Sequence, residues 1–304
     1  MGLSKYKFYK DGFESLGKCC DEKLCRQLNK KIYSVRNFNN IFLSKSEYFK
    51  LKKRKTIIKG NNPRPGRNLL HKLDSSFIFE NEKLIKNMRK VLGPFYKILD
   101  FKLVMGVPLE LIPEWVIKKT GGFHSVNLGS YIKPKYRDMT YFKGIDFHQD
   151  IIDFPDRTAD FITAYIYLDK VRVNTSPLYV IPRSHLLGAS KFPHKIFETK
   201  GDNLVYRVGK KSKNLKSEKI LGGAGTLSFW HPFVLHGTKP HEYSKPRISV
   251  RVLIEKNRRS HIGCLLDRVN DKIIGKKKLM AIRTDMSRSG KIIKKRNIIN
   301  SLKK

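Results

Sequence analysis

The sequence predicts a mainly β fold, a sandwich or barrel-like jelly roll with flanking helices, in a chain of 304 residues. Three observations lead to this prediction. The first ninety or so residues show helical periodicity, short apolar segments separated by turn residues follow from about residue 97, and 40% of all residues are hydrophobic. Many short strands at such spacing are typical of sandwiches and jelly rolls. The hydrophobic fraction excludes a disordered chain.

Two segments predict the helical part. Residues 21–35 place three apolar side chains at i, i+4 and i+8, which makes one apolar stripe on a helix. These side chains are Leu24, Leu28 and Ile32. Residues 81–91 form the second helix, which a Gly-Pro pair ends. Between the two, residues 52–67 are basic and contain two prolines, so we expect a loop there.

The strands are predicted where apolar residues alternate or cluster between turns. We expect them at residues 98–107, 125–132, 161–168, 178–181, 225–235 and 247–255. Residues 195–220 are polar and rich in lysine, so this segment is expected to be an excursion on the surface.

The domain organisation follows from these elements and from charge. We expect one domain at residues 1–256, with a helical part at about 1–95 and a jelly-roll core at about 96–256. A basic C-terminal extension at 257–304 follows. Residues 256–304 carry 16 Lys or Arg against three Asp, so this segment is denser in positive charge than the rest of the chain.

The net charge of +38 has two interpretations. The first is a composition bias, because Lys, Asn and Ile are all abundant, which is typical of coding DNA rich in A and T. The alternative is a polyanionic partner such as nucleic acid. No Phe, Tyr or Trp occurs after residue 256, which counts against base stacking by the extension. We therefore expect no specific nucleic-acid partner, and a field that favours acidic small molecules.

The four cysteines and the apolar segments bear on location. Cys19 and Cys20 are adjacent and no CxxC pair occurs, so neither a disulfide framework nor a zinc-site spacing is present. No run of 18 apolar residues exists, and the N-terminus lacks the apolar core of a signal peptide. We expect reduced thiols, no membrane span and a cytoplasmic location. The sequence does not indicate the oligomeric state.

A metal site is indicated by His148-Gln149-Asp150. A strand places residues i and i+2 on one face, so His148 and Asp150 can bind the same ion. The third ligand is one of His231, His236 and His241. His236 is the best candidate because it closes an apolar strand and precedes a glycine. Two histidines and one carboxylate leave adjacent positions open on ferrous iron.

A carboxylate-binding site is indicated by Arg247, Ser249 and Arg251, which share one face of a predicted strand. A guanidinium and a hydroxyl side by side can hold a carboxylate through charge-assisted hydrogen bonds. Arg251 has two interpretations, a substrate contact or a buried structural ion pair.

Four ordered segments resemble the phytanoyl-CoA dioxygenase family of Fe(II)- and 2-oxoglutarate-dependent oxygenases. They are YKDGFESL at 9–16, HQD at 148–150, TAYIYLDKVRVNTSPLYVIPRSHLLG at 163–188 and LHGTKPHEYSKPRISVRV at 235–252. The resemblance covers about residues 5–256. Two loop positions differ from the family pattern, at 174–178 and at Arg183, and both border the expected substrate site.

The resemblance implies a cupin-like double-stranded β-helix in which three side chains bind Fe(II) and act in catalysis: His148, Asp150 and His236. It implies that Arg247 and Ser249 hold the far carboxylate of 2-oxoglutarate. Strand alternation adds Tyr131, Thr163 and Tyr165 as candidate lining of that pocket. Arg251 and Arg183 are candidate contacts of the substrate, and His185 is expected to support its loop.

The reaction implied by the resemblance consumes O2 and converts 2-oxoglutarate to succinate and CO2 while a small organic substrate is hydroxylated. Related halogenases lack a carboxylate at the position of Asp150, so hydroxylation is expected. The substrate is not identified by the sequence, and we expect an anionic one. Two alternatives stay open: a ligand-binding jelly roll without catalysis, and a basic nucleic-acid-binding protein.

Overall fold

A computed structural model describes residues 3–54, 63, 67–121, 126–154, 157–192, 194–199, 201–208, 210–241, 243–257, 263–273, 282–283 and 300–301. The predicted loop at 52–67 lies largely outside these residues. Within them, no helix is long and apolar enough to cross a membrane.

The larger of two central sheets has six strands in the order β1-β12-β5-β14-β2-β3. All neighbours in it are antiparallel except β2 and β3. The strands are β1 (Phe13–Lys18), β12 (Thr226–Trp230), β5 (Phe161–Tyr167), β14 (Arg247–Lys256), β2 (Tyr96–Gly106) and β3 (Thr140–Phe142).

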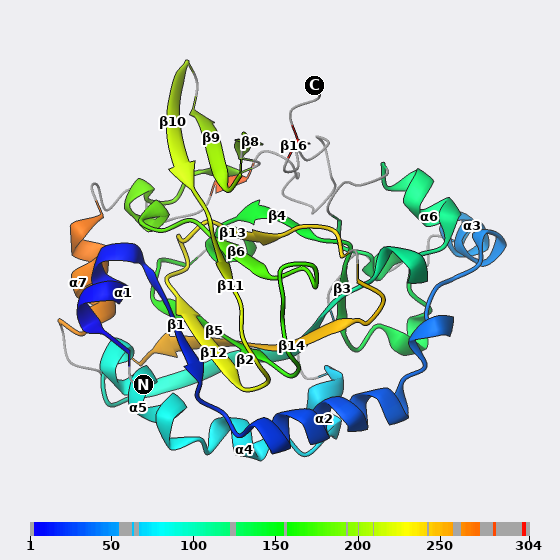
Figure 1. Ribbon diagram of the computed structural model, residues 1–304, viewed down its shortest axis with the longest axis horizontal. Helices are drawn as coiled ribbons and strands as arrows, with labels where there is room; N and C mark the ends of the chain where they lie inside the picture. The colour runs from blue at the N-terminus through cyan, green and yellow to red at the C-terminus, as the bar shows by residue number, and fades with distance from the viewer. Residues whose placement is uncertain are drawn as a thin grey trace.

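The smaller sheet lies above the larger one in Figure 1 and has the order β11-β6-β13-β4. Its strands are β11 (Glu218–Ile220), β6 (Leu178–Val180), β13 (His236–Thr238) and β4 (Ile145–His148). Buried side chains from both sheets pack in one cluster, which includes Tyr165 and Trp230 from the larger sheet and Val180 from the smaller one. The two sheets therefore face each other, and the predicted jelly roll is confirmed.

Helices cover the outer face of the larger sheet, mostly along the lower and left sides of Figure 1. Their apolar residues join those of the sheet in the largest buried cluster. The helices are α1 (Lys5–Asp11), α2 (Glu22–Val35), α3 (Lys45–Lys53), α4 (Ser76–Phe79), α5 (Glu82–Leu92), α6 (Glu114–Lys119) and α7 (Leu265–Lys272). Short 3-10 turns lie in the connections between helices and strands: η1 (Phe38–Asn40), η2 (Leu69–Lys72), η3 (Leu109–Leu111), η4 (Gly129–Tyr131), η5 (Pro134–Tyr136), η6 (Asp150–Asp153) and η7 (Ser184–Leu187).

The two predicted helices are both present, with side-chain caps at their N-termini. Asp21 caps α2 and Asn81 caps α5, each by accepting a backbone N–H three residues on. The buried stripe of α2 differs from the predicted one, because Leu24 is 39% exposed and Cys25 takes its place beside Leu28 and Ile32.

The strand predicted at 125–132 is wrong. The residues described there form isolated bridges and the turn η4. The Asn127 side chain accepts the Gly129 N–H at 2.9 Å. Such a local bond competes with strand pairing and favours a turn.

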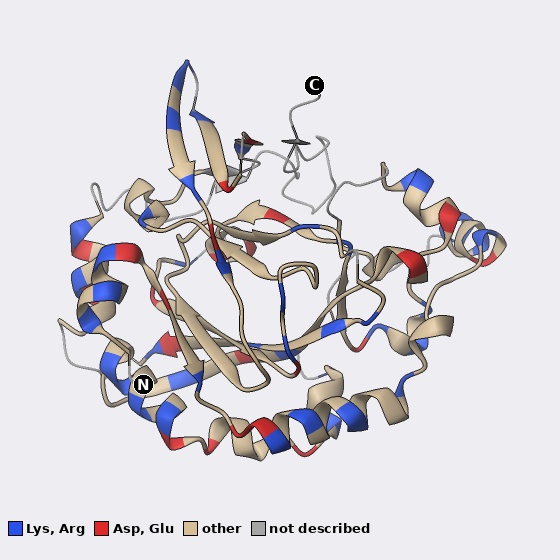
Figure 2. Cartoon of the chain, viewed as in Figure 1, with Lys and Arg blue, Asp and Glu red and all other residues tan. Residues whose placement is uncertain are grey.

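The lysine-rich segment forms a hairpin that projects from the top of Figure 1. It consists of β9 (Asn203–Val208) and β10 (Lys211–Lys216), which extend a sheet with β8 (Lys195–Glu198) and β16 (Asn300–Ser301). A further two-stranded pair joins β7 (Lys191–Phe192) to β15 (Ile282–Arg283). Figure 2 shows that lysine and arginine positions lie along β10 and are scattered over the helices and loops.

The start of the predicted C-terminal extension packs on the body. In α7, Leu265, Leu266 and Val269 are buried, and α7 contacts α1 and α5. Its Asn270 donates to the Ala159 carbonyl at 2.8 Å and lies 2.9 Å from His231 Nε2. The domain boundary at 256 stays a prediction, and it falls where β14 ends.

Candidate functional site

Two histidines face each other across the smaller sheet. His148, the last residue of β4, pairs in register with His236, the first residue of β13. Their ring centroids lie 4.3 Å apart. Asp150 Oδ1 lies 3.8 Å from His148 Nε2 and 3.6 Å from His236 Nε2. The ligand atoms of all three residues lie within 4.8 Å of one another, so they can share one metal ion.

Both imidazoles are held by the backbone in the tautomer that a metal ligand needs. Nδ1 of His148 donates to the Asp146 carbonyl at 2.8 Å, and Nδ1 of His236 donates to the Val234 carbonyl at 2.9 Å. The proton therefore sits on Nδ1, and the lone pair of Nε2 faces Asp150. A bond from the other ring nitrogen is the usual way in which a protein orients a metal-binding histidine.

The Asp150 carboxylate is held by three donors from the larger sheet. Oδ2 accepts from Thr163 Oγ1 at 2.5 Å and from Trp230 Nε1 at 2.7 Å. Oδ1 accepts from Arg251 Nη2 at 2.5 Å. Thr163 and Trp230 are cross-strand partners on β5 and β12, which explains why two residues far apart in sequence reach the same oxygen.

Electrostatics favours a charged carboxylate beside neutral imidazoles. Burial alone raises the pKa of Asp150, but Arg251, His236 and His148 outweigh it and hold this pKa well below its usual range. Burial lowers the pKa of His148, and it lowers the pKa of His236 to about 3. At neutral pH the cluster thus offers two imidazole nitrogens and one carboxylate, the donor set of a ferrous site with open positions.

Gln149, between the two predicted ligands, points the other way and anchors the segment. Its fully buried amide donates to the Gly188 and Phe233 carbonyls at 2.8 and 2.9 Å, and its oxygen accepts the Ser190 N–H at 2.9 Å. These bonds tie the metal-binding segment to two neighbouring loops. The sequence indicated the flanking residues but not this role.

Arg247 is a buried cation with free donors. Its Nη1 donates to Tyr165 Oη at 2.9 Å and to Ser249 Oγ at 3.1 Å. Its Nε and Nη2 are buried without a partner among the described residues, and the side chain forms no ion pair with any of them. A buried guanidinium is costly without an anion. This arrangement fits the carboxylate site that Arg247 and Ser249 were expected to form.

The other predicted residues fall into two groups. Thr163 and Arg251 contact Asp150, so Thr163 supports the candidate metal ligand and Arg251 forms the ion pair that was one of its two interpretations. Tyr131 instead stacks on Tyr48 at 5.3 Å, in contact with Trp115. Arg183 is exposed, with a left-handed φ of 63°. The structure does not bring Tyr131 or Arg183 into contact with the cluster.

Three residues at the site carried no signal that sequence reasoning could use. Trp230 donates to Asp150. Thr238, two residues after His236, has a buried hydroxyl with no partner in the described part of the chain. Lys102 on β2 is the direct cross-strand partner of Arg251. Each depends on strand register, which a single sequence does not reveal.

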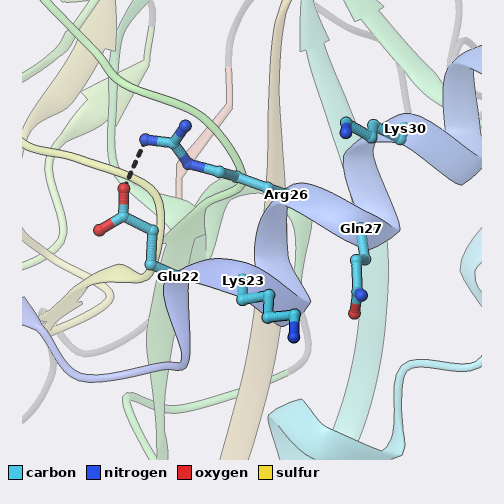
Figure 3. A pocket seen from close by; sticks show the side chains of 5 residues that line it. All are labelled: Glu22, Lys23, Arg26, Gln27 and Lys30. Atoms are coloured by element: carbon cyan, nitrogen blue, oxygen red, sulfur yellow. Dashed lines mark hydrogen bonds and ion pairs between the residues drawn. The ribbon is translucent and has the colours of Figure 1, made fainter.

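A surface pocket on the outer face of α2 is a separate feature (Figure 3). Glu22, Lys23, Arg26, Gln27 and Lys30 line it, and none belongs to the cluster. The only bond drawn among them joins Arg26 to Glu22 at 2.5 Å. Long polar side chains of one solvated helix face make this pocket, so it is not a candidate active site.

Residues 127–249 match the family model for phytanoyl-CoA dioxygenase (PhyH). A comparison with curated proteins finds no match. This match confirms the predicted family resemblance. Together with the cluster of His148, Asp150 and His236, it supports the predicted enzyme class and the predicted iron and 2-oxoglutarate.

Several solved structures are similar to this chain at low identity. The non-heme monooxygenase ThoJ in its apo form is 13% identical, with a TM-score of 0.49, over 84% of this chain and 77% of that one. The non-heme alpha ketoglutarate dependent carbocyclase SnoK from nogalamycin biosynthesis is 12% identical, with a TM-score of 0.49, over 84% of each chain. The epimerase SnoN is 13% identical, with a TM-score of 0.48, over 83% of this chain and 81% of that one.

Proposed function

We propose that this chain, which is phytanoyl-CoA dioxygenase-like over residues 127–249, hydroxylates a small anionic organic substrate with release of succinate and CO2. One observation carries the proposal: the same barrel holds a metal-binding cluster and a buried arginine with unused donors. The first fits a ferrous ion, and the second fits the far carboxylate of 2-oxoglutarate.

The residues present fit both groups. His148, Asp150 and His236 would hold Fe(II), and Arg247 with Ser249 would hold 2-oxoglutarate. When bound, iron and 2-oxoglutarate supply the activation of O2, of which one oxygen atom goes to succinate and the other to the hydroxylated substrate.

The chain itself orients the ligands and excludes water. Trp230 and Thr163 hold Oδ2 of Asp150, which leaves Oδ1 on the side of the histidines. At the end where the co-substrate would lie, Arg247 is 4% exposed and Ser249 is fully buried. Toward the other end, the side chain of His148 is 15% exposed and that of Arg251 is 11% exposed. The substrate is therefore expected to enter on the side of His148 and Arg251.

An anionic substrate is supported by Lys102 at this more open side. Lys102 is partly buried beside Arg251 and makes no hydrogen bond or ion pair within the described residues. Burial, and then the positive charge of Arg251, lower the pKa of its ammonium to about 8, although Asp153 and Asp100 act in the opposite direction. A substrate carboxylate or phosphate would give this ammonium a hydrogen-bonded partner.

A substrate screen tests the proposal. Consumption of 2-oxoglutarate in the presence of Fe(II) and O2 is measured with a panel of small carboxylates and phosphates and with their neutral esters. We expect stimulation by one or more acids and not by the matching esters, and we expect Lys102→Met to lose that preference. Stimulation by neutral compounds alone would contradict the anionic class.

The location is proposed on separate grounds. All four cysteines are free, and burial raises the pKa of the Cys20 and Cys25 thiols to about 12. These thiols are unreactive and suit a reducing compartment, which supports a cytoplasmic enzyme.

A further inference from the structure

The donors that remain free around Arg247 include one from a second residue, His241. This histidine is fully buried and follows the strand β13. Its position is fixed by the segment just after β2, because its carbonyl accepts the Leu109 N–H at 3.0 Å and its backbone forms a bridge with Pro108. The sequence offered His241 as an alternative third metal ligand, and it is not part of the metal-binding cluster.

Hydrogen bonding determines which nitrogen of His241 carries the proton. Nδ1 accepts the Tyr243 N–H at 3.2 Å, so the neutral ring has its proton on Nε2. Burial, followed by the charge of Arg247, lowers the pKa of this imidazole to about 4. Nε2–H is therefore a donor at neutral pH, and it is buried without an acceptor among the described residues.

Gly106 leaves room for an acceptor beside both side chains. It is the direct partner of Arg247 across the pair β2 and β14. A Cβ atom at Gly106 would lie 3.3 Å from Nη2 and 3.4 Å from Nε of Arg247, and 3.4 Å from Cδ2 of His241. Cδ2 is bonded to Nε2, so the free edge of the guanidinium and the free edge of the imidazole border the same space.

We propose that His241 donates a hydrogen bond from Nε2 to the far carboxylate of 2-oxoglutarate and so helps to select a five-carbon co-substrate with two carboxylates. Three buried donors then serve one anion: Nε and Nη2 of Arg247 and Nε2 of His241. This inference rests on the proposed function. It accounts for why these polar atoms lack partners among the described residues, in an interior where such atoms are normally bonded.

The role of His241 is tested by comparing two co-substrates. The affinities of 2-oxoglutarate and of 2-oxopentanoate, which has a methyl group in place of the far carboxylate, are measured anaerobically with Fe(II) from the visible charge-transfer band. Loss of one hydrogen bond to a charged acceptor corresponds to about tenfold to a hundredfold weaker binding. We expect His241→Phe to weaken 2-oxoglutarate by this factor and to leave 2-oxopentanoate unchanged.

The matched control is His241→Gln, whose amide N–H replaces Nε2–H and should restore most of the affinity for 2-oxoglutarate. If His241→Phe does not fold, His241→Leu takes its place. Unchanged 2-oxoglutarate affinity in the variant without a donor, or equal losses for both co-substrates, would overturn the role of His241. A wild-type protein that gives no band with either co-substrate would overturn the proposed function itself, and the inference with it.

Discussion

The indole N–H of Trp230 donates to Oδ2 of Asp150 at 2.7 Å, deep in the barrel. Both residues are almost fully buried, with 1% exposure each. This bond fixes the carboxylate so that its other oxygen faces the two histidines. Removing a hydrogen bond that orients a metal ligand typically lowers metal affinity or activity by about tenfold to a hundredfold.

Trp230→Phe should weaken iron binding by about tenfold to a hundredfold, because it removes a donor that orients Asp150. Iron affinity is measured by anaerobic titration of the metal-free protein. Trp115→Phe is the matched control, since Trp115 packs beside Tyr48 and Tyr131 and does not contact Asp150. Equal effects of the two substitutions would show that the bond to Asp150 has no particular role.

Alanine at Asp150 should abolish turnover of 2-oxoglutarate, while the two histidines retain weak iron binding. Alanine at His148 or at His236 should reduce iron binding further, because each removes a neutral nitrogen ligand. Turnover and bound iron are measured on the same samples. Full 2-oxoglutarate turnover after alanine replacement of all three residues would remove this cluster as the metal site.

Arg247→Ala should weaken 2-oxoglutarate binding by about tenfold to a hundredfold, which corresponds to about 1.5 to 3 kcal/mol for a charged hydrogen bond. Arg247→Lys keeps the charge but loses the paired N–H groups, so an intermediate affinity is expected. Iron binding should change little in both variants. If affinity for 2-oxoglutarate stayed at the wild-type level in the folded Ala variant, the carboxylate site would lie elsewhere.

Acid should destabilise the metal-free protein between about pH 6.5 and 4. Burial lowers the pKa of His185 and His241 to about 4, and of His194 and His231 to about 3, from an ordinary value of 6.5. Below about pH 6.5 the unfolded chain binds protons that the folded chain does not, so the free energy of unfolding falls as pH falls. Each such histidine contributes about 1.4 kcal/mol per pH unit.

His231→Gln should reduce the slope of unfolding free energy against pH by the contribution of one histidine. The slope is measured by urea unfolding at several pH values between 4.5 and 6.5. A general loss of stability in the variant does not affect this comparison, because only the slope is read. An unchanged slope would contradict a neutral, buried His231.

The basic surface should bind DNA only weakly and without sequence preference. The hairpin carries exposed lysines, including Lys211, Lys213 and Lys216, and residues after 273 add more positive charge. Deleting residues 274–304 should lower duplex binding at low salt and leave 2-oxoglutarate turnover intact. The deletion begins there because α7 packs on the body. Tight, sequence-selective binding at physiological salt that this deletion abolishes would favour the nucleic-acid alternative.

Local sequence patterns predicted the helices and strands that depend on residues close together in the sequence. The helices at α2 and α5 follow from periodicity and capping residues, and the strand at β5 follows from a run of apolar and β-branched residues. The strand expected at 125–132 fails because the Asn127 side chain bonds to the backbone two residues on and favours a turn. The segment does contain apolar residues, but the side chain of Asn127 within it favours a turn over a strand.

The three residues of the candidate metal site could be picked out because His148 and Asp150 are two residues apart and His236 lies next to a turn glycine. Residues that reach the site only because of strand register could not be predicted. Trp230 reaches Asp150 only because it is the partner of Thr163, and Lys102 lies at the site only because it is the partner of Arg251. The same applies to Gly106 and Arg247, which the pairing of β2 with β14 places opposite each other, and to His241, which a bridge to Pro108 places beside them.

The most direct test of the account is anaerobic addition of Fe(II) and 2-oxoglutarate to the metal-free protein. A weak visible charge-transfer band should appear with the wild type. It should be lost when both His148 and His236 are replaced by alanine, and it should need more 2-oxoglutarate when Arg247 is replaced by alanine. A wild-type protein that is folded, binds iron and gives no band at saturating 2-oxoglutarate would contradict the central claim that this barrel is an Fe(II)- and 2-oxoglutarate-dependent oxygenase.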